Sequence, residues 1–166
     1  MEVNGSSKIA VLGIGNLIMQ DEGVGIHVIR KLENEYTFQP EIELIDGGTS
    51  GSELYGFFED NDKMIIVDAV NFDEEPGFIG SIEKDDILKR LNTKMSMHNL
   101  GLTDVLSHVK LLDIEPSEIF LVGIQPAVIE LHDELSEIVS ERVDRILEVI
   151  FMKLAEWNVN CEVRGS

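Results

Sequence analysis

Cysteine and basic residues are scarce in this chain of 166 residues. The one cysteine, Cys161, excludes an intramolecular disulfide and a cysteine-based zinc site. Lysine and arginine together number 13 against 32 aspartates and glutamates, so the formal net charge is −19. A general nucleic-acid-binding protein needs a basic surface, and so does a protein that docks on an anionic membrane. The charge balance therefore argues against both classes.

Long apolar runs are also missing. No run approaches the ~20 residues that cross a bilayer, and residues 1–7 contain no apolar signal-peptide core. Together with the single cysteine, these absences predict a protein of the reducing cytoplasm. The sequence contains neither repeats nor a low-complexity linker, so residues 1–166 are expected to form a single domain, with residues 164–166 left out of the fold.

Buried strands alternate with amphipathic helices along the chain. Strongly apolar segments predict strands at 8–15, 41–46, 63–70 and 118–124, with a short edge strand at 78–84. Apolar residues at helical spacing predict helices at about 21–36, 50–60, 85–91, 102–112 and 133–157. Asp21 is the expected cap of the first helix. This alternation predicts an α/β fold with a parallel sheet and helices on both faces.

Two glycine-rich turns match known binding motifs only in part. The turn Gly13-Ile14-Gly15 follows a strand like a dinucleotide fingerprint, but Ile18 stands where the third glycine belongs. The segment 48–52 has the position of a nucleophile elbow, but Ser52 replaces its last glycine. Both are interpreted as structural turns.

Three separated residues form a possible metal site. Glu22 follows the first strand, and Asp68 lies at the end of the third. If these strands are neighbours, as in a flavodoxin-like order, both carboxylates face one cleft, where a proton or a cation would relieve their repulsion. His98 could reach the same edge, and two oxygens with one imidazole nitrogen suit zinc or nickel. Spacing alone also allows His98 to be a capping or packing residue.

Five segments, taken together, resemble the hydrogenase maturation endopeptidases. They appear in that family's order and cover the chain to about residue 150: VLGIGNLIMQDEGVG (11–25), ELIDGGTSGSEL (43–54), MIIVDAV (64–70), KMSMHNLGLTDVLS (94–107) and FLVGIQP (120–126). Members of the family remove a C-terminal peptide from the large subunit of nickel–iron hydrogenase. The resemblance implies three layers, with a twisted, mostly parallel five-stranded sheet between helices, similar to flavodoxin and phosphorylase folds.

The resemblance also assigns residues. It implies metal ligation by Glu22, Asp68 and His98, and a catalytic role for Asp46 in substrate processing. The loop after Asp46 would contact the substrate through Gly47, Gly48 and Thr49. One segment departs from the family: residues 127–136, AVIELHDELS, contain no glycine, where many relatives have one before the last helix.

The implied reaction is peptide hydrolysis on a nickel-loaded precursor of the large subunit. Nickel would arrive with the substrate, and zinc or cadmium could occupy the same site in vitro. Two other functions use the same sequence features. One is a non-catalytic nickel-sensing chaperone of the large subunit, and the other is a small flavodoxin-like binding module.

Overall fold

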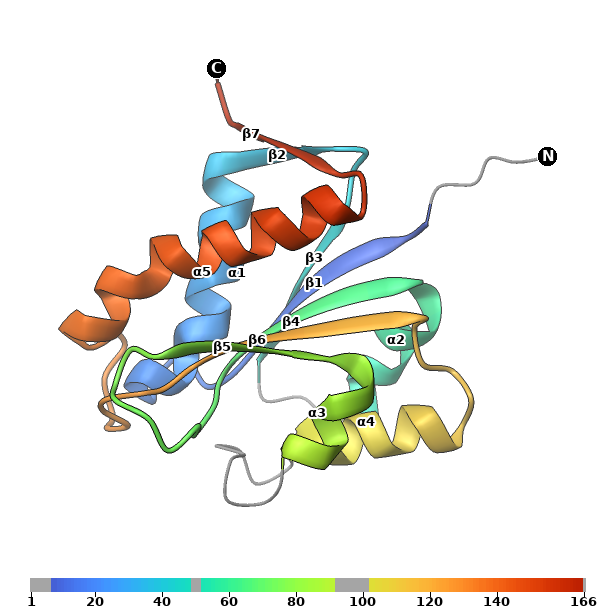
Figure 1. Ribbon diagram of the computed structural model, residues 1–166. Coiled ribbons are helices and arrows are strands. Elements are labelled where there is room, and N and C mark those ends of the chain that lie inside the picture. Colours follow the sequence, from blue (N-terminus) through green and yellow to red (C-terminus); the bar gives the residue numbers. More distant parts are fainter. Residues whose placement is uncertain (1–6, 49–51, 92–101, 166) are drawn as a thin grey trace.

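A five-stranded sheet with helices on both faces forms the body of the protein (Figure 1). The structure is a computed structural model that describes residues 7–48, 52–91 and 102–165. The strands of this sheet are β1 (Ile9–Ile14), β3 (Glu43–Gly48), β4 (Lys63–Ala69), β5 (Ile79–Glu83) and β6 (Glu118–Ile124). The helices are η1 (Gln20–Gly23), α1 (Val24–Glu35), η2 (Ser52–Leu54), α2 (Tyr55–Asp60), α3 (Lys84–Arg90), α4 (Leu102–Leu111) and α5 (Glu137–Glu156).

The strand order is β3-β1-β4-β6-β5, with all neighbours parallel except the edge strand β5, which runs antiparallel to β6. This confirms the predicted mostly parallel five-stranded sheet. It also confirms that the first and third strands of the prediction, β1 and β4, are neighbours. The carboxyl ends of parallel strands share one edge of a sheet, so the segments that follow β1, β3, β4 and β6 meet at one edge.

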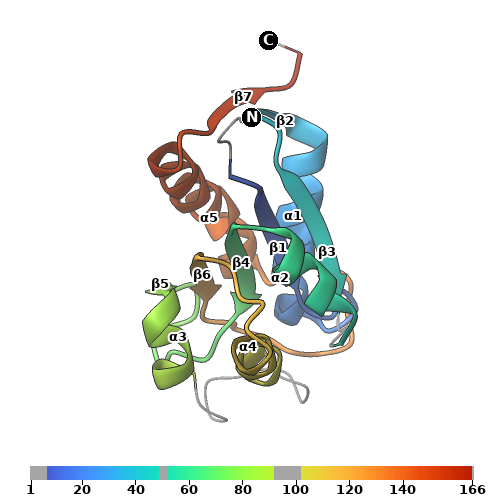
Figure 2. The same ribbon diagram turned by 90° about the vertical axis from the view of Figure 1, so that its right-hand side faces the viewer.

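The sheet separates two apolar cores. Helices α1 and α5 cover one face, and α2, α3 and α4 cover the other (Figure 2). Alternate side chains of β1 pack into the two cores. Val11 packs into the core on the side of α1 and α5, and Leu12 packs into the core on the opposite side. Burial on both faces explains why β1, β4 and β6 are almost continuously apolar. Among the described residues, no helix is long and apolar enough to cross a membrane.

A second, two-stranded sheet was not predicted. The helix expected to reach Tyr36 ends at Glu35, and β2 (Tyr36–Gln39) pairs antiparallel with β7 (Asn160–Val163). This pairing joins residues more than 120 positions apart, which local periodicity cannot reveal. Arg164 was left out of the predicted fold, but its guanidinium donates to the carbonyls of Glu33 and Tyr36 at 2.8 and 3.1 Å.

Two predicted helix starts were wrong. Helix α1 begins at Val24, behind the short η1 turn, and no side chain caps it. Asp21 therefore does not cap α1; its carboxylate accepts hydrogen bonds from the segment between β6 and α5. Helix α5 begins at Glu137 instead of residue 133, and the hydroxyl of Ser136 caps it by accepting from the Val139 amide at 3.4 Å.

Candidate functional site

Two of the predicted metal ligands lie at the carboxyl ends of β1 and β4. Asp68 is buried, 4% exposed, near the end of β4, and its Oδ1 accepts from the Ala69 amide at 2.9 Å. Glu22 is half-buried in η1, which follows β1 and contacts β4. The register pairs Gly13 of β1 with Val67, the residue before Asp68. The sheet edge thus brings together the segments that carry both carboxylates, as the sequence predicted.

Glycines allow this close approach. A Cβ at Gly15, whose φ is +143°, would overlap the carbonyl of Glu22. A Cβ at Gly25 would lie 2.5 Å from the carbonyl oxygens of both Ile14 and Val67. The start of α1 therefore rests directly on the ends of β1 and β4. Any other residue at Gly25 would push the helix, and with it Glu22, away from Asp68.

Two predicted site residues, His98 and Thr49, fall outside the described residues. His98 precedes α4 in sequence, and Thr49 follows β3. Their assigned roles as metal ligand and substrate contact stay predictions.

Asp46 belongs to the exposed end of β3, on the other side of β1 from Asp68. Its Oδ1 accepts from the Gly48 amide at 3.1 Å, and the Gly48 carbonyl accepts from the Gly15 amide at 2.8 Å. An open hollow beside this turn has a lining that includes Asp46, Gly48 and Arg30. Gly47 is buried, and an added Cβ would have little room there. It would lie 2.8 Å from the Leu12 side chain and 3.0 Å from the Gly13 carbonyl.

Arg30 was not among the predicted site residues. It is an exposed residue of α1 that shares the hollow with Asp46 and with Ile26, one helical turn earlier. The sequence could have indicated that Arg30 lies beside Ile26, because residues four apart lie on one face of a helix. In a chain of net charge −19, a guanidinium beside Asp46 gives this hollow one positive wall.

A second group of potential metal ligands lies on the segment between β6 and α5. Ligand atoms of His132, Asp133 and Glu134 lie within 4.8 Å of one another, and all three residues are exposed. The Nδ1 of His132 already accepts from the Glu134 amide at 3.0 Å. Exposed carboxylates that are neighbours in sequence commonly gather in this way without an ion, so the closeness of these three residues does not by itself indicate a metal site.

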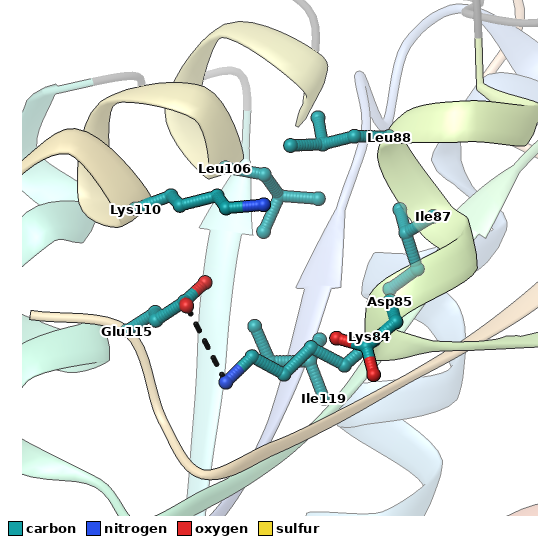
Figure 3. A pocket seen from close by; sticks show the side chains of 8 residues that line it. All are labelled: Lys84, Asp85, Ile87, Leu88, Leu106, Lys110, Glu115 and Ile119. Atoms are coloured by element: carbon teal, nitrogen blue, oxygen red, sulfur yellow. Dashed lines mark ion pairs between the residues drawn. The ribbon is translucent and has the colours of Figure 1, made fainter. Parts of the chain in front are cut away.

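Another hollow lies between α3 and α4 (Figure 3). Ile119 lines it from the start of β6, at the amino end of that strand and thus opposite the edge that carries Asp68. Lys84 pairs there with Glu115 at 3.5 Å and donates to the Pro116 carbonyl at 2.8 Å. These bonds link the start of α3 to the segment before β6, so the hollow belongs to the framework of the fold.

His27 of α1 makes the stability of the protein pH-dependent. Burial lowers the pKa of His27, and the charge of Arg30 lowers it further, against smaller opposing effects of Asp133. Its Nε2 is buried without a hydrogen-bond partner in the described part of the chain. Because the folded pKa lies below the unfolded value of about 6.5, the unfolded chain binds more protons between these two values. The stability from neutral His27 is therefore full above pH 6.5 and is lost as the pH falls through the folded pKa.

We expect the melting temperature to fall between pH 7.5 and pH 5.5, and to fall less in a His27→Gln variant. Differential scanning calorimetry of both proteins at the two pH values measures this difference. Protonation of carboxylates affects both proteins alike. The difference between their falls in melting temperature therefore measures the contribution of His27. Equal losses would show that His27 does not contribute to the pH dependence.

Comparisons with known proteins agree with this arrangement. A family model described as hydrogenase maturation protease matches residues 26–153. A hydrogenase 2 maturation protease of Escherichia coli is 35% identical over 160 residues, which are 96% of this chain and 98% of that protein. A HupD hydrogenase expression/formation protein of Bradyrhizobium diazoefficiens is 31% identical over 96% of this chain and 84% of its own length.

Solved structures lead to the same family. The hydrogenase maturating endopeptidase HybD from Escherichia coli superposes with a TM-score of 0.88 at 34% identity, over 95% of this chain and 98% of that one. The HybD protease from Thermococcus kodakarensis has a TM-score of 0.74 at 27% identity, over 89% and 99% of the two chains. These neighbours are endopeptidases, which favours the enzyme over the chaperone and the binding module. The chain belongs to the family of hydrogenase maturation proteases.

Proposed function

We propose that this endopeptidase removes the C-terminal extension of a nickel–iron hydrogenase large-subunit precursor in the cytoplasm, after nickel has been inserted. Glu22, Asp68 and His98 complete the coordination of the nickel ion that the precursor carries. The tight complex forms only with the nickel-loaded precursor, because these contacts exist only there. The protein thereby distinguishes a finished metal centre from an unfinished one.

The arrangement around Asp68 is the observation that carries this proposal. Asp68 places a carboxylate that is 4% exposed at the end of an apolar strand, on the sheet edge where the segments after the parallel strands meet. The η1 turn with Glu22 contacts the same strand, so two acidic side chains gather at one edge. Such an edge favours a cation, and oxygen ligands combined with an imidazole suit a borderline divalent ion such as nickel. Zinc or cadmium would fit the same ligands in vitro.

Asp46 lies on β3, which β1 separates from β4, and the peptide to be cleaved would pass beside it. Its exposed carboxylate is free to accept a proton from the attacking water or to orient the C-terminal extension in the hollow beside Arg30. Water adds its hydroxyl to the carbonyl carbon of the scissile bond, and the departing amine takes up a proton. Nickel supplies Lewis-acid polarisation at this bond.

The single cysteine is a poor alternative nucleophile. Cys161 belongs to β7 in the small sheet, outside the five-stranded sheet whose edge carries Asp46 and Asp68. Burial raises the pKa of its thiol, and the neighbouring Glu162 adds to this rise. A raised pKa reduces the thiolate fraction at neutral pH, and the thiolate is the reactive form. These facts support a water nucleophile.

The decisive experiment incubates the purified protein with nickel-loaded and nickel-free precursor and weighs the products by intact-mass spectrometry. We expect a C-terminal peptide to be lost only from the nickel-loaded form. Equal processing of both forms would refute the nickel requirement, and binding without any mass loss would favour the chaperone function. A His98→Ala variant should lose the nickel-dependent part of the association; unchanged association would remove His98 from the ligand set.

An Asp46→Asn variant should cleave more slowly while it still binds the precursor. Loss of a general base typically costs about 10²–10⁴ in rate, and the exposed position of Asp46 predicts an unchanged melting temperature. Asp86→Asn, an exposed carboxylate on α3, is the matched control and should process normally. Binding and single-turnover cleavage are measured separately. Normal cleavage by Asp46→Asn would exclude Asp46 from the mechanism.

A further inference from the structure

Asp21 is a fully buried carboxylate in the turn that carries Glu22. Its exposed fraction is 0%, and it accepts four hydrogen bonds. The donors are the Ala127 amide at 2.8 Å, the Val128 amide at 2.9 Å, the Ser136 amide at 2.7 Å and the Ser136 hydroxyl at 2.8 Å. This number of donors satisfies both carboxylate oxygens, which a buried charge requires.

All four donors come from the segment 127–136, between β6 and α5. Backbone bonds run beside them: the Asp21 amide donates to the Val128 carbonyl at 3.1 Å, and the Gln20 amide donates to the His132 carbonyl at 2.9 Å. The His132 amide in turn donates to the Ile18 carbonyl at 2.9 Å. Asp21 is thus the centre of a junction between the turn after β1 and the segment after β6. These two strands flank β4, which carries Asp68.

The same junction fixes the backbone of Glu22. The Glu22 amide donates to the Met19 carbonyl at 3.2 Å, and the close approach at Gly15 holds the Glu22 carbonyl from the other side. Glu22 therefore has little freedom to shift its main chain relative to β1. The junction also gives residues 127–136, which contain no glycine, a defined path.

We propose that Asp21 is a positioning residue, which holds Glu22 at the place from which it ligates the nickel of the precursor. This inference rests on the proposed function. A buried charge is a poor way to stabilise a fold, because a well-packed apolar side chain often does so equally well or better. Its stronger effect is to specify one arrangement of the groups around it. Here those groups are the two segments on either side of Asp68.

The test compares three variants of the full chain with the wild type at 15 °C. Asp21→Asn keeps the shape of the side chain but turns an amide group toward donors. Ser136→Ala keeps the carboxylate and removes one of its donors. Ile146→Val is the control for stability alone, since Ile146 is a core residue of α5, 0% exposed and ten residues beyond Ser136. The readouts are KM and kcat for the nickel-loaded precursor, and the Kd for Ni²⁺ alone by competition with a chromophoric chelator.

Asp21→Asn should raise both the KM and the Ni²⁺ Kd about 10–100-fold, the usual cost of losing a residue that orients a metal ligand. Ser136→Ala should raise both severalfold, and it decides the question if Asp21→Asn does not fold. Ile146→Val should lower the melting temperature and leave both constants unchanged. The inference is overturned if Asp21→Asn, or Ser136→Ala in its place, behaves like Ile146→Val.

Glu22→Gln separates this inference from the proposed function. If Glu22→Gln weakens nickel-dependent processing and Asp21→Asn does not, only the positioning role fails. If Glu22→Gln processes the nickel-loaded precursor like the wild type, the ligand role of Glu22 fails, and the positioning role falls with it.

Discussion

Replacing Asp68 with asparagine is expected to abolish nickel-dependent processing of the precursor while the protein stays folded. Asparagine has nearly the same shape, and its carbonyl oxygen can still accept from the Ala69 amide. What is lost is the negative charge at a buried position, 4% exposed, beside the turn with Glu22. An amide oxygen is a much weaker ligand for a divalent ion than a carboxylate. We expect a loss on the order of a thousandfold in kcat/KM, which is about 4 kcal/mol of transition-state stabilisation.

Asp62→Asn is the matched control for this experiment. Asp62 precedes the same strand, β4, but at its amino end, where the carboxylate accepts from the Lys8 amide at 2.8 Å. It is exposed, and asparagine can replace its acceptor. Quantitative mass spectrometry of nickel-loaded precursor at several times gives kcat/KM for both variants. Near-normal processing by a folded Asp68→Asn protein would show that the reaction does not need a charged ligand there.

The main sheet was predictable because its signals are local. The strands β1, β4 and β6 are buried on both faces and are therefore apolar runs that glycine, proline or polar residues end, as in 8–15 and 63–70. The alternation with helices then determines which strand ends share an edge. Glu22 and Asp68 could be assigned to one edge without any knowledge of side-chain contacts, because parallel topology brings those strand ends together.

The features that were missed depend on contacts between distant parts of the chain. An aspartate before a helix usually caps it, so the sequence pattern suggested that role for Asp21. The donors that it actually meets lie 106 to 115 positions later. The β2–β7 pair has the same cause, since each strand is only four residues long and its partner lies more than 120 positions away. The hollow shared by Asp46 and Arg30 forms only after α1 has packed beside β3.

Gly25→Ala is expected to destabilise the protein strongly, although alanine normally favours a helix. Gly25 lies in the first turn of α1, and a Cβ there would lie 2.5 Å from two carbonyl oxygens of the strand ends below. Main-chain atoms of β1 and β4 cannot yield without disrupting the sheet. Overpacking typically costs 1–3 kcal/mol, so this contact with rigid backbone should cost at least about 3 kcal/mol. At 2–4 °C per kcal/mol, the melting temperature should fall by roughly 6–12 °C.

Gly56→Ala provides the control of opposite sign. Gly56 is also helical, in α2, but no atom lies within 4 Å of an added Cβ, so alanine should stabilise the protein by about 0.5–1 kcal/mol. Calorimetric melting of both variants, followed by processing assays at 15 °C, separates stability from function. Because the start of α1 carries η1 with it, Gly25→Ala should also process poorly at a temperature where it is folded, whereas Gly56→Ala should match the wild type. A Gly25→Ala protein with unchanged melting temperature would mean that α1 does not rest on the ends of β1 and β4, and the derivation of the Glu22–Asp68 edge would fail with it.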